Sequence, residues 1–238
     1  MTEWFKEWFN EEYLALYPHR DAGDAERLVR LLQDALPWRA GWQVLDVGCG
    51  AGRHTRALEA AGARCIGLDL SATLLQRARL VTEAPLIRAD MRYLPVRAAS
   101  MDLTVNLFTS FGYFRTDQEH QRALDEMAAT IRPGGWFVID FLNAESVAST
   151  LVPRSNSESD GVPVEVTRRI VDAGRFVEKR IRMGGGREWL ERVRLLTAAE
   201  LEAMLQRASV SVELRFGDYD GGPLAAGRPR VILAGRRA

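Results

Sequence analysis

The sequence predicts an α/β protein built on a doubly wound, mostly parallel sheet, with an antiparallel β meander inserted into it. Apolar segments of strand length alternate with helical segments from residue 43 to residue 141, and a glycine-rich turn joins the first strand to the next helix. Three later strand-like runs are separated by hairpin signals. Alternation of this kind favours a parallel sheet covered on both faces, whereas hairpin-linked strands pair antiparallel.

Two helical segments precede the alternating region. Residues 2–17 place their aromatic side chains on one stripe with charged residues opposite, which predicts a single amphipathic helix that Pro18 ends. A second helix is expected to begin at Asp24 and to stop before Pro37. We therefore assign residues 1–40 to an N-terminal helical cap.

Residues 41–150 are expected to form the α/β core. Its strands should lie at 43–47, 64–69, 86–89, 103–107 and 136–141, and its helices at 53–61, 72–81 and 118–131. Ser71 precedes the second of these helices and has the side chain of a good N-cap. In such sheets, ligands bind at the carboxyl ends of the strands, where the strand order reverses.

Residues 151–196 are expected to form the antiparallel insert. The segment 153–161 is polar and rich in turn residues, so we expect a loop there. Three strands should follow, at 164–171, 176–183 and 188–195.

Residues 197–238 should then complete the core. Thr197 and Glu200 have the spacing of a capping box, which predicts a helix to about Arg207. Two further strands, at 210–216 and 230–234, should pair as a hairpin on the edge of the sheet.

The turn after the first strand carries the strongest functional signal. Gly48, Gly50 and Gly52 leave a strand-to-helix turn without side chains, which lets backbone N–H groups approach a ligand. The next strand ends in Asp69, where a carboxylate can accept hydrogen bonds from a ribose diol. These features predict a nucleoside-containing cofactor. NAD remains an alternative, although its fingerprint requires glycine at the position of Arg53.

The spacing Asp46-x-Gly48-x-Gly50-x-Gly52 resembles motif I of the class I S-adenosylmethionine (SAM) dependent methyltransferases. The resemblance covers residues 40–145 and continues, in the family's order, at GLDLS, ADMRYLP, MDLTVNLFTSFGYF and RPGGWFVIDFLN. It implies a Rossmann-like methyltransferase sheet with the insert as a lid. It also implies SAM as cofactor and S-adenosylhomocysteine as product.

The resemblance assigns most of the cofactor site. The glycine turn should face the methionine part of SAM, with Asp46 near the amino group, while Asp90 should reach the adenine and Met91 should pack on it. The three carboxylates have a structural alternative, because Asp46, Asp69 and Asp90 could instead serve the local turns and helix starts. The expected cofactor-binding residues are Tyr17, Arg20, Asp46, Gly48, Gly50, Gly52, Asp69, Leu70, Asp90, Met91, Asn106 and Leu107.

Methyl transfer demands mainly alignment and exclusion of water, so we expect no strong catalytic constellation. The expected catalytic residues are His19, as a general base that titrates near neutral pH, and Tyr113, as a group that orients the acceptor. His120 is expected to be exposed at a helix start. The acceptor pocket is expected to be lined by Tyr13, Phe108, Ser110 and Phe111, whose rings could alternatively be core.

Two absent motifs narrow the acceptor. The fourth strand is not followed by the Asn/Asp-Pro-Pro-Tyr/Phe tetrapeptide of adenine and glutamine methyltransferases, and no Pro-Cys nucleophile occurs. A small molecule with an O, N or C nucleophile is therefore the expected partner, and the chain loosely resembles amino-sugar N-methyltransferases. A SAM-binding protein without activity and an RNA methyltransferase that uses the arginines of the insert remain alternatives.

Composition narrows the class of protein further. The formal net charge of the 238 residues is zero, so we expect neither nucleic acid nor a membrane surface as a partner. Cys49 and Cys65 indicate neither a disulfide framework nor a zinc site, and we expect no metal. No run is apolar enough for a signal peptide or a membrane span. We expect a cytoplasmic protein, with a homodimer through the β insert as a possibility.

Overall fold

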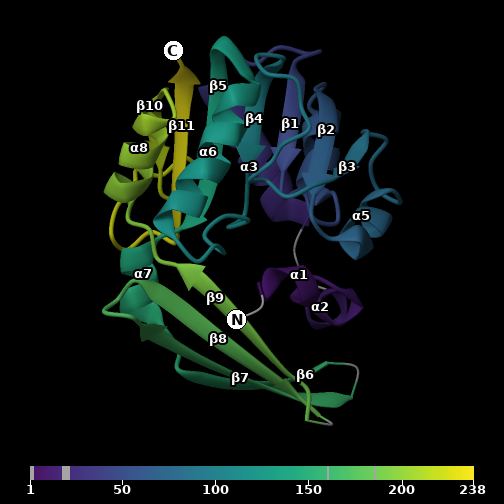
Figure 1. The fold of residues 1–238 in the computed structure, drawn as a ribbon, viewed down its shortest axis with the longest axis vertical. Helices are drawn as coiled ribbons and strands as arrows, with labels where there is room; N and C mark the ends of the chain where they lie inside the picture. The colour runs from purple at the N-terminus through teal and green to yellow at the C-terminus, as the bar shows by residue number, and fades with distance from the viewer. Residues whose placement is uncertain (1–2, 18–21, 160, 185) are drawn as a thin grey trace.

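The computed structural model describes residues 3–17, 22–159, 161–184 and 186–238. Figure 1 shows a large mixed sheet flanked by helices and a second, antiparallel sheet beyond one end of it. Two short N-terminal helices lie between the two sheets. The functional question is therefore what these three parts enclose.

The large sheet has seven strands in the order β10-β11-β5-β4-β1-β2-β3. Across the sheet, the five strands β5, β4, β1, β2 and β3 each run parallel to the next, whereas β11 is antiparallel to both β5 and β10. The strand order reverses between β1 and β4, which creates a switch point at their carboxyl ends. The bounds are Gln43–Val47, Arg64–Asp69, Leu86–Arg88, Met101–Asn106 and Ile131–Leu142 for β1 to β5, Val210–Phe216 for β10 and Arg230–Arg237 for β11. The predicted doubly wound sheet is confirmed.

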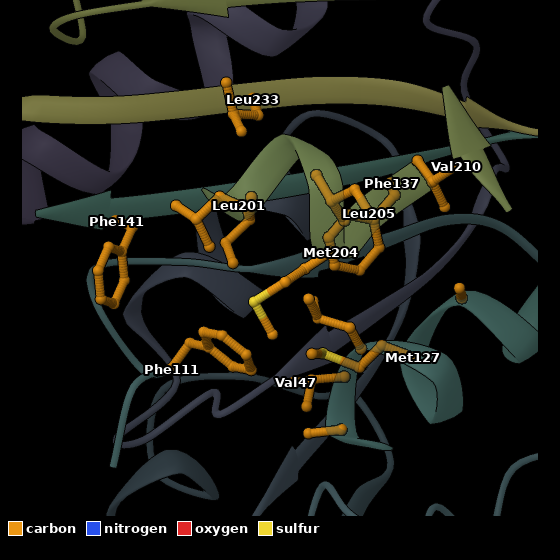
Figure 2. Close-up of a cluster of buried hydrophobic side chains, with 14 of the residues drawn as sticks. Val47, Phe111, Met127, Phe137, Phe141, Leu201, Met204, Leu205, Val210 and Leu233 are labelled. Carbon is orange, nitrogen blue, oxygen red and sulfur yellow. The ribbon is translucent and has the colours of Figure 1, made fainter. Parts of the chain in front are cut away.

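Helices cover both faces of this sheet. They are α3 (Ala22–Ala35), α4 (Arg53–Ala60), α5 (Ala72–Ala78), α6 (Asp117–Thr130) and α8 (Ala198–Arg207), while α7 (Ala144–Thr150) follows β5 at the end of the sheet next to the insert. Ser71 caps α5, and Thr197 with Glu200 forms the expected capping box of α8. Only α7 has no counterpart in the prediction. Figure 2 shows one face of the core, where Phe111, Phe137 and Phe141 from the sheet side meet the methionines and leucines of α6 and α8.

The N-terminal segment contains two helices, so the prediction of one continuous helix was wrong. They are α1 (Phe5–Trp8) and α2 (Glu11–Leu16). Asn10 between them is extended, and its side chain accepts hydrogen bonds from the N–H groups of Glu12 and Tyr13. Asparagine favours such caps over helix interiors because its side chain competes for backbone N–H groups.

The insert is a four-stranded antiparallel sheet in the order β6-β7-β8-β9. The three predicted strands are present as β7 (Val162–Val171), β8 (Phe176–Met183) and β9 (Glu188–Arg194). The loop expected at 153–161 was wrong for its central part, because β6 (Arg154–Ser159) pairs with β7 there. This strand is mostly exposed at the edge of the sheet, so it lacks the apolar alternation that marks a half-buried strand.

Among the helices in the described ranges, none combines the length and apolar character needed to cross a bilayer.

Candidate cofactor and acceptor site

A cavity of about 340 Å³ lies where β1, β2 and β4 end, beneath α1 and α2. This volume falls within the range of small-molecule sites, roughly 300–1,000 Å³. Residues of the glycine turn line it, together with residues of the loops after β2, β3 and β4 and of the N-terminal helices. The lining residues are Phe5, Phe9, Tyr13, Leu14, Tyr17, Gly48, Cys49, Gly50, Ala51, Arg53, His54, Leu68, Asp69, Leu70, Leu74, Ala89, Asp90, Met91, Leu107, Phe108, Ser110, Tyr113 and Phe114.

Gly48 and Gly50 are required in the glycine turn for different reasons, Gly48 because a side chain would clash and Gly50 because of its positive φ. A Cβ on Gly48 would lie 2.6 Å from the Ser110 Cβ, and the φ of Gly48 is +77°. Gly50 also has positive φ, but its Cβ position is open, with Leu74 3.9 Å away. Both line the cavity. Gly52 does not; it is the N-cap residue of α4 and packs against Ala78.

Asp69 both holds the local turn and lines the cavity, the two roles that the sequence left open. Its carboxylate accepts the N–H groups of Gly50 at 2.9 Å and Ser71 at 2.8 Å, and it also lines the cavity. Burial raises the pKa of Asp69, against the opposing effect of these hydrogen bonds. Since a carboxylate has about four lone-pair sites, Asp69 retains acceptor capacity for a ligand.

Asp46 lies behind the cavity and does not line it. The Thr55 hydroxyl donates to its carboxylate at 2.7 Å, which ties β1 to α4. Asp46 is 1% exposed, and burial raises its pKa to about 6. The structure therefore places Asp46 in a local packing role beside the turn.

Asp90 and Met91 both line the cavity. Asp90 pairs with Arg92 at 2.6 Å and accepts the backbone N–H of that residue at 3.0 Å. Burial acts to raise the pKa of Asp90, but Arg92 outweighs it and the pKa is lowered. Arg92 also pairs with Glu3 and Glu119 at 2.8 Å, so this corner links the N-terminus, the β3 loop and α6.

Asn106 ends β4 directly below the glycine turn. Its amide donates to the Val47 carbonyl at 2.9 Å, while its Oδ1 is buried without a hydrogen-bond partner in the described part of the chain. Asn106 does not line the cavity, whereas the following Leu107 does. An unsatisfied buried acceptor costs free energy, so a ligand that supplies an N–H at this turn would stabilise the site.

The residues present thus fit SAM on two counts. The cradle around Gly50 has room for a ligand, and Asp69, which lines the cavity, has remaining acceptor capacity.

Aromatic side chains form most of the opposite wall. Phe9 contacts Tyr13 with ring centroids 4.9 Å apart and Tyr113 with centroids 5.8 Å apart. Phe108 faces Arg53, whose guanidinium carbon is 4.0 Å from the ring centroid. The structure brings Tyr13, Tyr17, Leu70, Phe108, Ser110 and Tyr113 to this cavity, as predicted for the site.

Phe111 does not belong to this wall. It is fully buried and packs against Phe141 and His120 in the core. Residues 108–110 are half-buried whereas Phe111 and Gly112 are buried, and the backbone turns at Gly112, with φ +92°. The alternative that some of these rings are core holds for Phe111.

Of the two expected catalytic residues, only Tyr113 can be placed. Its hydroxyl donates to the Thr109 carbonyl beside the cavity. His19 and Arg20 lie outside the described residues.

The expected exposure of His120 was wrong. Its side chain is 0% exposed, its Nε2 accepts the Phe114 N–H at 3.2 Å, and burial lowers its pKa to about 4. It is a neutral core residue at neutral pH.

Several lining residues were absent from the predicted set. Arg53 and His54 follow the glycine turn directly and form the first turn of α4. The glycine motif marks this position, so both residues could have been included in the predicted set. Phe5 and Phe9 lay in the predicted aromatic stripe without an assigned partner, Leu14 lay outside that stripe, and Phe114 closes the predicted aromatic segment. The remaining unpredicted lining residues are Cys49, Ala51, Leu68, Leu74 and Ala89.

The insert was expected to be the lid, but none of its described residues lines the cavity; α1 and α2 border it instead, and the insert contacts these helices. Trp8 Nε1 donates to Glu191 at 2.7 Å, and Trp189 Nε1 donates to Glu12 at 2.9 Å. These bonds join α1 and α2 to β9.

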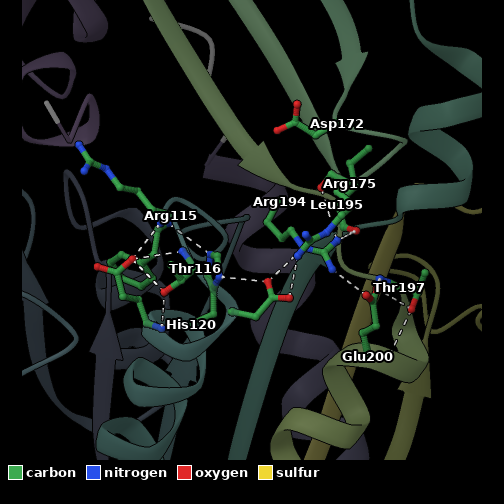
Figure 3. Close-up of polar contacts among 12 residues, drawn as sticks. Arg115, Thr116, His120, Asp172, Arg175, Arg194, Leu195, Thr197 and Glu200 are labelled. Atoms are coloured by element: carbon green, nitrogen blue, oxygen red, sulfur yellow. Dashed lines mark hydrogen bonds and ion pairs between the residues drawn. The ribbon is translucent and has the colours of Figure 1, made fainter. Parts of the chain in front are cut away.

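Ion pairs fasten the insert to the core. Figure 3 shows Arg194 at the end of β9 beside Arg175 and Glu200. Arg194 pairs with Glu200 at 2.7 Å and with Asp117 at 3.2 Å, and Arg175 reaches the same Asp117 at 2.9 Å. The start of α6, the start of α8 and the insert therefore share one charged contact.

The fold is a Rossmann-like sheet with a cavity at its switch point. Residues 44–135 match a family model described as a methyltransferase domain. The dTDP-3-amino-3,6-dideoxy-alpha-D-glucopyranose N,N-dimethyltransferase of Streptomyces fradiae is 29% identical over 228 residues, which cover 89% of this chain and 84% of that protein.

Two solved structures share the fold. The CcbJ methyltransferase from Streptomyces caelestis matches with a TM-score of 0.81 at 18% identity, covering 98% of this chain and 99% of that one. SAM-bound CalS10, an amino pentose methyltransferase from Micromonospora echinaspora, matches with a TM-score of 0.67 at 23% identity, covering 96% and 95%. The chain therefore contains a region similar to a methyltransferase domain and shares the fold of these methyltransferases.

Proposed function

We propose that this protein transfers the methyl group of SAM to an amino nitrogen of a small molecule, an amino sugar or a related amine, and releases S-adenosylhomocysteine. The observation that carries the proposal is the extent of the similarity to the Streptomyces fradiae N,N-dimethyltransferase. It spans 89% of this chain and so includes the cap and the insert as well as the cofactor half.

The chain's own residues would hold the cofactor along the strand ends. Asp69 would accept the ribose hydroxyls, the backbone of Gly48 and Gly50 would face the methionine part, and Asp90 and Met91 would border the adenine. Asn106 would act from beneath the turn through its unsatisfied Oδ1. When bound, SAM supplies an activated methyl group on a sulfonium.

The aromatic wall would position the acceptor and exclude water. This wall would hold the acceptor nitrogen in line with the methyl group that SAM would supply, and S-adenosylhomocysteine would leave with the electron pair of the broken carbon–sulfur bond. The methylated nitrogen would then lose its proton to the proposed base. Rings beside a sulfonium and an ammonium contribute cation–π attraction of about 1 kcal/mol each. We keep His19 as the proposed base, Tyr113 as an orienting group and Arg20 as the proposed partner of the cofactor carboxylate.

Two further features belong to this proposal. A cytoplasmic location is supported by Cys49 and Cys65, both free, since cytosolic thiols stay reduced. A homodimer through the insert is supported by the exposed edge strand β6, because such edges can pair with another chain.

The test is methylation of dTDP-3-amino-3,6-dideoxyglucose with SAM, followed by mass spectrometry of the sugar nucleotide. The matched control carries a hydroxyl in place of the amino group. Addition of one or two methyl groups to the amine alone supports the proposal. Methylation of the hydroxyl control, or of neither compound while a phenol or carboxylic acid panel reacts, would reject nitrogen as the acceptor atom.

A further inference from the structure

A buried carboxylate behind the cavity collects donors from three distant segments. Asp140 in β5 is 0% exposed, and its side chain accepts the Phe108 N–H at 2.9 Å, the Tyr219 hydroxyl at 2.9 Å and Arg230 Nε at 2.7 Å. Burial and Asp140 raise the pKa of Tyr219, so its hydroxyl remains a donor. We refer to Asp140, Tyr219 and Arg230 as the Asp140 cluster.

Arg230 extends this cluster to the turn after β4. Its Nη2 donates to the Thr109 hydroxyl at 3.1 Å, and its guanidinium carbon lies 5.4 Å from the Phe108 ring centroid. Burial opposes its charge, but Asp140 more than offsets this and the pKa of Arg230 is raised. The arginine is therefore a permanent cation fixed against the turn.

The turn that the cluster holds has an uncommon backbone. Phe108 and Thr109 have φ values of +54° and +61°, consecutive left-handed conformations at residues that carry a Cβ. Such conformations persist only where surrounding contacts impose them. Here Asp140 accepts the backbone N–H groups of both residues. Its carboxylate accepts the Phe108 N–H, and its carbonyl accepts the Thr109 N–H at 2.9 Å.

This turn shapes the cavity. Phe108, Ser110 and Tyr113 all line it, and the Tyr113 hydroxyl donates to the Thr109 carbonyl. None of the Asp140 cluster residues is among the lining residues. Any effect of the cluster on the reaction must therefore pass through the turn.

We propose that Asp140, Tyr219 and Arg230 are positioning residues for methyl transfer: they hold the Phe108–Thr109 turn left-handed and so set the acceptor wall of the cavity. The part of this inference that concerns turnover rests on the proposed function. At the cofactor end of the cavity, the contact between Asp69 and Gly50 is a separate hydrogen bond, and the turn reaches this end through Ser110, whose hydroxyl donates to the Gly48 carbonyl at 3.1 Å.

The first test measures the turn without any acceptor. The nine phenylalanines are labelled with 4-fluorophenylalanine, and the Phe108 signal is assigned in the fluorine NMR spectrum by its loss in Phe108→Leu. Arg230→Gln and Asp140→Asn should shift or broaden this signal. The control is Thr104→Val, which breaks the buried Thr104–Thr130 hydroxyl pair away from the cavity and should leave the signal in place.

The second test separates positioning from general stability. Arg230→Gln should lower kcat/KM for the amino sugar nucleotide roughly tenfold to a hundredfold, the scale of a small misplacement, while the dissociation constant of S-adenosylhomocysteine should change much less, because the Asp69–Gly50 contact is retained. Thr104→Val should change neither quantity. If the wild type methylates no amine, the proposed function fails, and the fluorine measurement still decides the claim about the turn.

Two results would overturn the inference. One is a Phe108 signal that is the same in Arg230→Gln and wild type. The other is an equal change in Thr104→Val, which would show that any loss of core stability moves the turn.

Discussion

At the scale of single residues, Asp69 both holds the glycine turn through the Gly50 N–H and provides the proposed contact to the ribose. Asp69→Ala should weaken SAM binding by roughly 1–3 kcal/mol, because a charge-assisted hydrogen bond to the ligand is lost. Since the same carboxylate holds the Gly50 N–H, Asp69→Asn serves as the milder control. Titration calorimetry measures both variants. An unchanged affinity in Asp69→Ala would reject the ribose assignment.

His120 is a second residue with a measurable consequence. Its pKa in the folded protein is lowered to about 4 from an ordinary value of 6.5, so acid protonates the unfolded chain first. The free energy of unfolding should therefore fall as the pH drops from 6.5 towards 4, by up to about 3 kcal/mol. Above pH 6.5 this contribution is constant.

Urea unfolding at several pH values measures this effect. His120→Gln removes the titration and keeps an acceptor for the Phe114 N–H, so subtracting its pH profile cancels the other groups, including Asp46. Parallel profiles of the two proteins between pH 6.5 and 4.5 would contradict the assignment.

Single residues also show where sequence reasoning succeeds and where it stops. Asp69 and Gly48 were predictable because the glycine-rich turn and the acidic end of the next strand form a motif that can be read from the sequence. The Asp140 cluster was not, since Asp140 and Arg230 are 90 positions apart and meet only through the pairing of β5 with β11. His120 is buried because the segment that contains Phe111 and Phe114 packs against it.

At the scale of elements, α1 and α2 form the roof of the cavity and β9 supports them. Glu12 accepts from Trp189 at 2.9 Å and pairs with Arg187, while Ser71 Oγ donates to the Phe9 carbonyl at 2.5 Å from the core side. Two short helices have little stability alone, so these contacts hold the roof in place.

Trp189→Phe combined with Glu12→Gln should speed the release of S-adenosylhomocysteine, because the roof loses its support from the insert. Most affinity changes of this kind appear in the dissociation rate, and we expect several-fold. Stopped-flow tryptophan fluorescence measures it. Arg182→Gln, on the exposed part of the same sheet, is the matched control. Equal release rates in all three proteins would show that the roof is held from the core alone.

The helices and strands also show which features a local sequence pattern can predict and which it cannot. The parallel strands, the Ser71 cap and the Thr197–Glu200 capping box were predictable because apolar runs and cap spacings are local signals. The break at Asn10 and the strand β6 were missed, since one polar cap interrupts an otherwise continuous stripe and an exposed edge strand carries no apolar alternation.

At the scale of the whole molecule, the arginines of the insert are matched by carboxylates. Glu178 pairs with Arg169 at 2.6 Å and Arg192 at 2.7 Å, and Glu188 pairs with Arg182 at 2.9 Å. With a formal net charge of zero, the protein has little attraction for a phosphate backbone. We expect no retention of a labelled single-stranded RNA at low salt in a gel-shift assay. Binding that falls steeply with salt would revive the RNA methyltransferase alternative.

The central claim is that the cavity under α1 and α2 is the SAM site, and calorimetric titration of the purified protein with S-adenosylhomocysteine tests it most directly. NADH is the control ligand, because its dinucleotide fingerprint is broken at Arg53. The account predicts micromolar binding of S-adenosylhomocysteine at one site per chain and no heat with NADH. Binding of NADH alone, or of neither ligand, would contradict it.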